Sequence, residues 1–304
     1  MGLGIGELFA ARFRIRHELG GGGNGVVYEV LDEKFGTERA LKVLVGHRQR
    51  DEQARAAFVR ESRSAAAIAS DYVVRVYDYG VDSDGTPWLL MERLHGANLA
   101  EQVQRDGPLS LDDARRLVVE LGHALGAAHA LGLLHLDLKP ANLFLARAQK
   151  PGAPVELKVL DFGLAHTIQA GRTHVQMTTQ AGTLAWMPPE QHDPGARLRP
   201  TADVWPLGLI AFWMLTGRAY WKALAAGDAQ ANAMVLMVEV AQGATEAASA
   251  RAGSLGAAGR LPEGFDAWFS RCMATEASQR WPDGAAATRE LEALLLRATS
   301  APPP

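Results

Sequence analysis

The sequence predicts an α+β fold, with a mainly β first part and a larger, mainly α second part. Two observations carry this prediction. Short runs rich in β-branched and aromatic residues, separated by turn-forming stretches, fill residues 13–94, and helical patterns follow from about residue 99. The chain has 304 residues, of which 48% are hydrophobic and 21% are charged. These proportions are those of a globular chain that can bury a sizeable core, and they exclude wholesale disorder and a fibrous class.

The first part is predicted to contain five strands and one helix. The strands are RFRIRHEL, VVYEVLD, ERALKVLV, VVRVYDYGVD and PWLLMERL. Between the third and the fourth lies RDEQARAAFVRESRSAAAIAS, which is rich in Ala, Arg and Glu and contains neither Gly nor Pro. That composition favours a single helix among the strands.

The second part is predicted to be mainly helical, with one hairpin inside it. The segment SLDDARRLVVELGHALGAAHALG opens with Ser110 as the N-cap of a helix. The apolar residues on one face of this helix are Leu117, Leu121, Leu125 and Ala128. A turn-forming stretch between LFLA and VELKVL predicts two short strands, and Asp161 directly follows the second. Farther on, MVLMVEVA predicts a helix, and GATEAASARAGSLGAAG after it predicts a loop.

Charge, apolar runs and cysteine content exclude several partners and locations. Lys and Arg number 31 and Asp and Glu 34, and this net charge of −3 predicts neither a nucleic-acid partner nor an anionic membrane surface. The longest apolar run, residues 204–215, contains a proline and is well short of the roughly 20 residues of a membrane span. It therefore predicts a buried helix. Cys272 is the single cysteine and the N-terminus lacks the pattern of a secretory signal, so we expect a cytoplasmic protein.

A glycine cluster, LGGGGNGVV, separates the first two predicted strands. Gly20, Gly22 and Gly25 would let backbone N–H groups approach a polyphosphate without obstruction by a Cβ atom. A glycine-rich hairpin turn explains the same residues equally well, and a dinucleotide fold is disfavoured because a strand follows where that fold has a helix. Lys42 on a predicted strand and Glu61 on the predicted helix could together hold phosphates, although each is more often an ordinary exposed residue.

The strongest signal is HLDLKPANLFL followed by VLDFGLA, which places Asp161 24 residues after Asp137. This arrangement groups Asp137, Lys139 and Asn142 near Asp161, so that two carboxylates, an amide oxygen and an ammonium come together. Oxygen ligands of this kind suit magnesium. We expect His135 to be a packed, hydrogen-bonded core histidine, because no second nitrogen ligand lies at metal spacing and zinc is therefore not expected.

With these motifs in this order, the sequence resembles the eukaryotic-like protein kinases, and most of all the bacterial serine/threonine kinases, over about residues 13–296. The resemblance implies a two-lobed protein-kinase fold, with an N-lobe over residues 13–94 and a C-lobe over residues 95–296. Residues 1–12 would then be an N-terminal extension. Residues 297–304 would be the start of a proline-rich linker or tail.

The resemblance also implies what the site residues do. Mg·ATP would be the phosphate donor, with Mn²⁺ as a substitute metal, and a protein would be the acceptor. Asp137 would be the catalytic base, Lys139 would stabilise the γ-phosphate, and Lys42, paired with Glu61, would hold the α- and β-phosphates. The magnesium ligands would be Asn142 and Asp161. The residues around the nucleotide would be Leu19, Gly20, Gly22, Gly25, Val27, Ala40, Lys42, Met91, Glu92, Leu94 and Phe144.

Further residues resemble structural positions of the family. Glu190 would pair with Arg280, and Asp203 would brace the backbone of the catalytic loop. We expect Arg280→Ala to loosen or unfold the helical lobe, since breaking a buried pair from one side costs about 3–5 kcal/mol. Thr183 resembles the threonine that contacts the catalytic aspartate in serine/threonine kinases.

The sequence departs from the family at Leu136, which stands where the family usually has arginine. The cation that would bind a phosphate on the activation segment is therefore missing. We hypothesise that Thr173, Thr178 or Thr179 is autophosphorylated with only a modest effect on activity. Ala65 is small where many kinases have a larger apolar residue, so we expect the helix that carries it to be loosely docked, and we hypothesise that contact with a partner or a homodimer tightens it.

Two alternatives to an active protein kinase remain open at this point. A nucleotide-binding pseudokinase scaffold is supported only by Leu136 and by two unusual prolines, Pro188 and Pro206. A small-molecule kinase of related fold is disfavoured, because such kinases generally lack the closing Pro-Glu of the activation segment, here Pro189 and Glu190.

Overall fold

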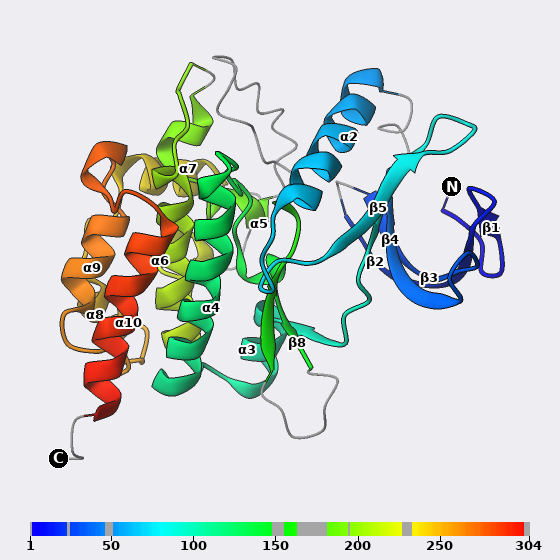
Figure 1. Ribbon diagram of the computed structural model, residues 1–304. Coiled ribbons are helices and arrows are strands. Elements are labelled where there is room, and N and C mark those ends of the chain that lie inside the picture. Colours follow the sequence, from blue (N-terminus) through cyan, green and yellow to red (C-terminus); the bar gives the residue numbers. More distant parts are fainter. Residues whose placement is uncertain are drawn as a thin grey trace. The chain divides into compact units, whose positions relative to one another are not determined.

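The structure is a computed structural model (Figure 1) that describes residues 2–22, 25–45, 51–147, 155–162, 181–193, 195–226 and 233–300. The chain divides into two compact units, Met1–His95 and Gly96–Pro304. None of the helices in these described ranges combines the length and the apolar character needed to cross a bilayer.

The first unit is built on a six-stranded antiparallel sheet. In spatial order its strands are β1 (Leu8–Phe9), β2 (Phe13–Gly22), β3 (Gly25–Asp32), β4 (Thr37–Val43), β6 (Pro87–Met91) and β5 (Val76–Val81). Strands β2 to β6 are the five that the sequence predicts. The short strand β1 is an addition, and it places Phe9 opposite Phe13 and in the same apolar core as Ile15, Tyr28 and Trp88.

The segment whose composition predicts a helix forms α2 (Glu52–Ala67). This helix packs against β5 and β6 of the sheet (Figure 1). It begins after Asp51, whose carboxylate accepts hydrogen bonds from the N–H groups of Gln53 at 2.9 Å and Ala54 at 3.3 Å. These bonds satisfy amides that have no partner inside the helix. Ala54 and Phe58 pack with Leu44 and hold the helix on the sheet.

The second unit is mainly helical. Its helices are α3 (Leu99–Asp106), α4 (Leu111–Ala130), α5 (Ala181–Leu184), α6 (Thr201–Thr216), α7 (Ala233–Gln242), α8 (Ala248–Ser254), α9 (Phe265–Cys272) and α10 (Gly284–Ser300). Nearly every residue of α6 is buried, as the apolar run 204–215 predicts. Helices α4 and α10 lie side by side (Figure 1), and a Cβ atom on Gly122 would come within 2.3 Å of Thr288. The mainly α character of this part is confirmed.

Two local predictions in this unit have different outcomes. The Ser110 hydroxyl accepts a hydrogen bond from the Asp113 N–H at 3.1 Å and caps α4, and the four apolar residues predicted on one face of this helix are buried. The loop predicted after α7 contains a helix, α8. Its position is held by tertiary contacts, since Arg251 Nε donates to the Tyr220 carbonyl at 2.7 Å.

A three-stranded antiparallel sheet completes the second unit and positions the site. Its order is β7 (Gly96–Asn98), β8 (Leu143–Ala146) and β9 (Glu156–Val159), and β8 with β9 is the predicted hairpin. A short 3-10 helix, η1 (Pro140–Asn142), leads directly into β8. Asp161 follows the end of β9, and Leu143 at the start of β8 pairs with Val159 at the end of β9, so Asn142 and Asp161 flank the same, open end of the hairpin.

Candidate active site

The carboxylate of Asp137 is the centre of a hydrogen-bonded cluster in the second unit. Lys139 Nζ donates to Asp137 Oδ1 at 2.9 Å and Oδ2 at 3.0 Å, and also to Thr183 Oγ1 at 3.2 Å. Asn142 Nδ2 donates to the Asp137 carbonyl at 2.7 Å and to Oδ2 at 3.1 Å. The structure thus brings together Asp137, Lys139, Asn142 and Thr183, as the sequence predicts, and fixes the orientation of the carboxylate.

Asp203 at the start of α6 holds the loop that carries Asp137. Its side chain accepts from the backbone N–H groups of His135 and Leu136, both at 2.9 Å, and lies 2.8 Å from His129 Nε2. Burial of Asp203 opposes ionisation, but the hydrogen bond and charge of His129 and the amide of His135 lower its pKa below the ordinary value. Asp203 therefore braces the backbone of the loop as an ionised, fully buried carboxylate.

His135 is a packed core histidine, as expected. It is fully buried against the ring of Phe162, with ring centroids 4.7 Å apart. Its Nδ1 accepts from the Asp137 N–H at 3.3 Å, and its Nε2 lies 3.0 Å from the Leu160 carbonyl. These contacts tie the loop to the end of β9.

Asn142 and Asp161 supply oxygen atoms that suit magnesium. Because Asn142 Nδ2 donates to Asp137, its amide oxygen is the group left to act as a ligand. The Leu160 N–H donates to the Asn142 carbonyl at 2.8 Å, which ties the residue before Asp161 to the same loop. Magnesium is typically held by one or two carboxylates together with waters and substrate phosphates, so this donor set fits it. Across the described ranges, no group of three or more His, Cys, Asp or Glu side chains is arranged as a metal site.

The sheet of the first unit carries most residues predicted to surround a nucleotide. Lys42 on β4 is 7% exposed and stands opposite Val27 on β3, and Val27 in turn stands opposite Gly20 on β2. Gly25 has a φ of 127°, and a Cβ atom there would lie 2.5 Å from the Val43 carbonyl oxygen, so only glycine fits this position at the start of β3. The sheet thus places Gly20, Val27 and Lys42 side by side.

The remaining predicted nucleotide residues are distributed over both units. Ala40 on β4 and Met91 on β6 are buried and directly opposite each other, and Glu92 Oε1 accepts from the Arg75 N–H at 2.7 Å. The other residues of the first unit are Leu19 and Gly22 on β2 and Leu94 after β6. Phe144 lies on β8 of the second unit. Glu61 lies on α2 with its side chain outside the described part, so its pairing with Lys42 stays a prediction.

Two contacts that support the loop carrying Asp137 have no counterpart in the sequence prediction. His129, which the sequence places on a helix without a further role, contacts Asp203. Gln191 Nε2 donates to the Leu136 carbonyl at 2.9 Å. Both residues are far from their partners along the chain, and no local pattern signals either contact. Thr173, Thr178 and Thr179 lie outside the described residues.

Glu190, which follows Pro189, is paired with Arg280 as the sequence predicts. Arg280 NH1 and NH2 donate to Glu190 Oε1 and Oε2 at 2.6 and 2.8 Å. The Arg280 side chain is completely buried and that of Glu190 is 18% exposed. This bidentate pair joins the segment before α6 to the segment before α10.

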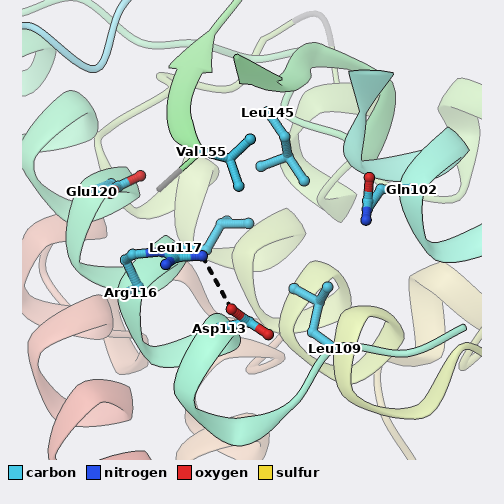
Figure 2. Close-up of a pocket in the computed structure, with 8 residues that line it drawn as sticks. All are labelled: Gln102, Leu109, Asp113, Arg116, Leu117, Glu120, Leu145 and Val155. Carbon is cyan, nitrogen blue, oxygen red and sulfur yellow. Dashed lines mark hydrogen bonds and ion pairs between the residues drawn. The ribbon is translucent and has the colours of Figure 1, made fainter. Parts of the chain in front are cut away.

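The second unit also contains a cavity of about 130 Å³ that includes no predicted site residue (Figure 2). It is lined by Gln102, Leu109, Asp113, Arg116, Leu117, Glu120, Leu145 and Val155. Arg116 NH2 donates to Asp113 Oδ1 at 3.0 Å, and the Leu157 N–H donates to Glu120 Oε2 at 2.8 Å. Burial raises the pKa of Glu120 above its ordinary value, although the Leu157 amide and Arg116 act in the opposite direction.

Known proteins with similar sequences are bacterial serine/threonine kinases. The protein kinase domain family matches residues 13–287. The probable serine/threonine-protein kinase CE0033 of Corynebacterium efficiens is 33% identical over 218 residues, which cover 69% of this chain and 32% of that protein. The probable serine/threonine-protein kinase pknA2 of Bifidobacterium longum is 30% identical over 294 residues, covering 95% of this chain and 36% of that protein. The chain thus spans about a third of the length of these relatives.

A solved structure shows the same fold. The crystal structure of the Mycobacterium tuberculosis PknI kinase domain matches with a TM-score of 0.69 and 24% identity, covering 97% of this chain and all of that one. The kinase fold and the family predicted from the sequence are confirmed, and the comparisons give no support to the pseudokinase alternative. The chain belongs to the protein kinase family.

Proposed function

We propose that the chain transfers the γ-phosphate of Mg·ATP to serine or threonine hydroxyl groups of proteins, with Asp137 as the catalytic base. The observation that carries this proposal is the set of contacts on the Asp137 carboxylate. Lys139 and Asn142 hold both of its oxygens, while the side chain stays 10% exposed. A carboxylate fixed in this way is preorganised for a hydroxyl group, which is what positioning in phosphoryl transfer requires.

In the proposed reaction the substrate hydroxyl oxygen forms a bond to the γ-phosphorus while the bond to the bridging oxygen of ADP breaks. Asp137 orients the hydroxyl group and accepts its proton. Lys139 lies within hydrogen-bond distance of Asp137 and Thr183, so its positive charge is available to the phosphoryl oxygens. Magnesium, or manganese in its place, would be held by Asn142 and Asp161 and would neutralise charge on the phosphates.

The first unit would bind the rest of the nucleotide. Lys42, on a central strand of the sheet, would hold the α- and β-phosphates, with Glu61 orienting it. Gly20, Gly22 and Gly25 would let backbone N–H groups reach the phosphates. The residues of this unit that would contact the base are Leu19, Val27, Ala40, Met91, Glu92 and Leu94. Phe144, which the resemblance adds to this set, lies on β8 of the second unit.

A transfer assay with labelled ATP tests the proposal. The purified chain, incubated with magnesium and a generic basic protein, is expected to label itself or the protein. Asp137→Asn should lower the rate at least about 100-fold, the smaller end of what a positioned acid or base contributes. The matched control is Asp112→Asn, which alters an exposed carboxylate in the first turn of α4 and should leave the rate unchanged.

Two further measurements separate catalysis from binding. Lys42→Met should weaken ATP binding, seen as a smaller rise in melting temperature with nucleotide, because a ligand stabilises the state that binds it. If ATP raises the melting temperature of the parent but no label is transferred with either metal, the chain binds nucleotide without catalysis and the proposal fails.

A further inference from the structure

The cavity of Figure 2 lies among helices α3 and α4 and the hairpin of β8 and β9. Four of its eight lining side chains are apolar, namely Leu109, Leu117, Leu145 and Val155. Leu117 is 5% exposed and Val155 is 38% exposed, so the cavity has a buried wall and an exposed rim. Its volume of about 130 Å³ is close to the roughly 150 Å³ of an apolar cavity that binds benzene. The cavity is therefore the size of one ring or one short apolar chain.

Two of the three charged side chains that line the cavity neutralise each other. Arg116 NH2 donates to Asp113 Oδ1 at 3.0 Å, and these side chains are 40% and 53% exposed. Gln102 is engaged as well, since its Nε2 donates to Asp106 Oδ2 at 2.6 Å and its Oε1 accepts from Arg105 NH2 at 2.6 Å. The charge and the hydrogen-bonding groups of these three lining residues are thus largely satisfied within the protein.

Glu120 is the third charged side chain, and its carboxylate is only partly satisfied. Oε2 accepts from the Leu157 N–H at 2.8 Å. In the described ranges the other oxygen, Oε1, forms neither a hydrogen bond nor an ion pair. Burial raises the pKa of the group; of the charged groups around it, Arg116 and Lys158 favour the ionised form and Glu156 opposes it. The ionised carboxylate is therefore stabilised most by a ligand that brings both a positive charge and a hydrogen-bond donor.

We infer that this cavity binds a small organic ammonium ion, with its apolar part against the leucine and valine side chains and its N–H group at Oε1 of Glu120. An ammonium group offers up to three donors, which suits a carboxylate oxygen that lacks one. A neutral apolar molecule would fill the same space but would leave this oxygen buried without a donor. An anion would be repelled by Glu120, because Arg116 is already paired with Asp113.

Two other classes of ligand fit the cavity less well. A divalent metal ion needs several oxygen ligands, and half of the lining residues are apolar. A protein partner needs a surface far larger than one cavity of this size. The inference concerns binding alone and holds whether or not the chain transfers phosphate.

Three probes of similar size separate the effect of the charge from that of the ring. At neutral pH benzylamine is a cation, benzyl alcohol is uncharged and benzoate is an anion. Ligand-observed NMR titrations of the purified chain should give a dissociation constant of about 1 mM or lower for benzylamine, since a ligand with few atoms has limited affinity. Benzyl alcohol should bind at least about tenfold more weakly, because its hydrogen bond to Glu120 lacks the charge of the donor. Benzoate should bind more weakly still.

Three variants test whether the binding occurs in the cavity. Glu120→Gln keeps an acceptor for the Leu157 N–H and should weaken benzylamine binding at least about tenfold, while benzyl alcohol binding changes less than about twofold. Val155→Phe should fill the cavity from its exposed rim and abolish binding of both probes. The matched control is Asp112→Asn, which removes an exposed carboxylate of α4 that does not line the cavity and should bind like the parent.

The pH dependence gives an independent readout. Benzylamine stays protonated on acidification, whereas Glu120 loses its charge as the pH falls through its raised pKa, so the affinity of the parent should fall at low pH. Glu120→Gln should lack this loss. A urea unfolding curve for each variant establishes that it is folded before its affinity is compared.

Several outcomes would overturn the inference. It fails if benzylamine does not bind the parent, or if benzyl alcohol or benzoate binds as tightly as benzylamine. It also fails if folded Glu120→Gln and Asp112→Asn bind benzylamine equally well, because the charge of Glu120 would then play no part. If folded Val155→Phe keeps the affinity of the parent for both probes, the binding lies elsewhere and the inference is wrong.

Discussion

Arg280→Ala should destabilise the second unit strongly, because the guanidinium group is buried and fully engaged. It holds both oxygens of Glu190, and its Nε donates to the Ala274 carbonyl at 2.7 Å. NH1 also donates to the Thr201 carbonyl at 3.1 Å. The group lies over the ring of Trp205, 5.0 Å from its centroid. Truncation to alanine removes all of these contacts at once.

The largest part of the expected loss comes from Glu190. Breaking a buried pair from one side leaves an uncompensated charge and typically costs about 3–5 kcal/mol. The carbonyl groups of Ala274 and Thr201 each lose a donor, at about 0.5–1.5 kcal/mol net per hydrogen bond. These contributions are not additive, so we expect a loss of at least about 3–5 kcal/mol, a large share of a typical total of about 5–15 kcal/mol.

Urea unfolding followed by tryptophan fluorescence measures this loss in the relevant unit. Of the seven tryptophans only Trp88 lies in the first unit, so the signal reports mainly on the second. The control is Arg115→Ala, whose partner Glu292 lies 3.7 Å away with both side chains about one-third exposed. Exposed pairs contribute about 0–1 kcal/mol. If the two variants lose the same stability to within about 1 kcal/mol, the argument from burial is refuted.

Two other predictions concern pH and phosphorylation. Because the pKa of Glu120 is raised in the folded chain, its carboxyl group stays protonated to a higher pH there than in the unfolded chain. Its contribution to the free energy of unfolding therefore falls as the pH rises above the ordinary pKa of a glutamate. Glu120→Gln, whose amide oxygen can still accept from Leu157, should therefore gain stability relative to the parent between about pH 4.5 and pH 7 in urea titrations; a difference independent of pH would contradict this. Replacing Thr178 and Thr179 by Ala should reduce labelling of a protein substrate less than about 100-fold, or roughly 2.7 kcal/mol, and a larger loss would show that Leu136 does not remove control by phosphate.

The structure confirms a helix whose apolar residues recur at helical spacing in the sequence, whereas a helix that is held by tertiary contacts is not predicted. Helix α4 has a capping serine and an apolar face at helical spacing, and both appear in the structure. Helix α8 lies in a segment of Ala, Gly and Ser that favours a loop. It is held by Arg251 and by the Ser249 N–H, which donates to Asp266 Oδ1 at 2.7 Å. Such partners are distant in sequence, so composition alone cannot reveal them.

The site shows the same division between local and distant contacts. Asp137, Lys139 and Asn142 are close in sequence, and their spacing predicts a cluster that the structure contains. The contact of His129 with Asp203 joins residues 74 positions apart, and nothing near either residue indicates the other. The resemblance predicts the contact of Asp203 with the backbone of the loop, which the structure contains, but it does not predict the contact of Asp203 with His129.

The backbone of Leu136 is held by contacts that do not depend on its side chain. Its φ of 59° lies in the left-handed region, which is strained for a residue with a Cβ atom. The Asp203 carboxylate accepts from its N–H at 2.9 Å, and Gln191 Nε2 donates to its carbonyl at 2.9 Å. Since the carboxylate and the amide satisfy both backbone groups, the strained conformation persists with any side chain that the surroundings accept.

The surroundings of Leu136 accept an apolar side chain. It is 4% exposed and packs in a cluster with Leu134, Leu198 and Ala202, so an arginine that kept this packing would have to bury its charge among apolar side chains. The cation usual in the family is thus replaced by core packing. In the described part of the chain, Asp203, Lys139 and Asn142 contact the loop that carries Asp137, and His135 and Gln191 add to these contacts. Because this loop is already held at both backbone and side chain, we expect phosphorylation of Thr178 or Thr179 to change the position of Asp137 only modestly.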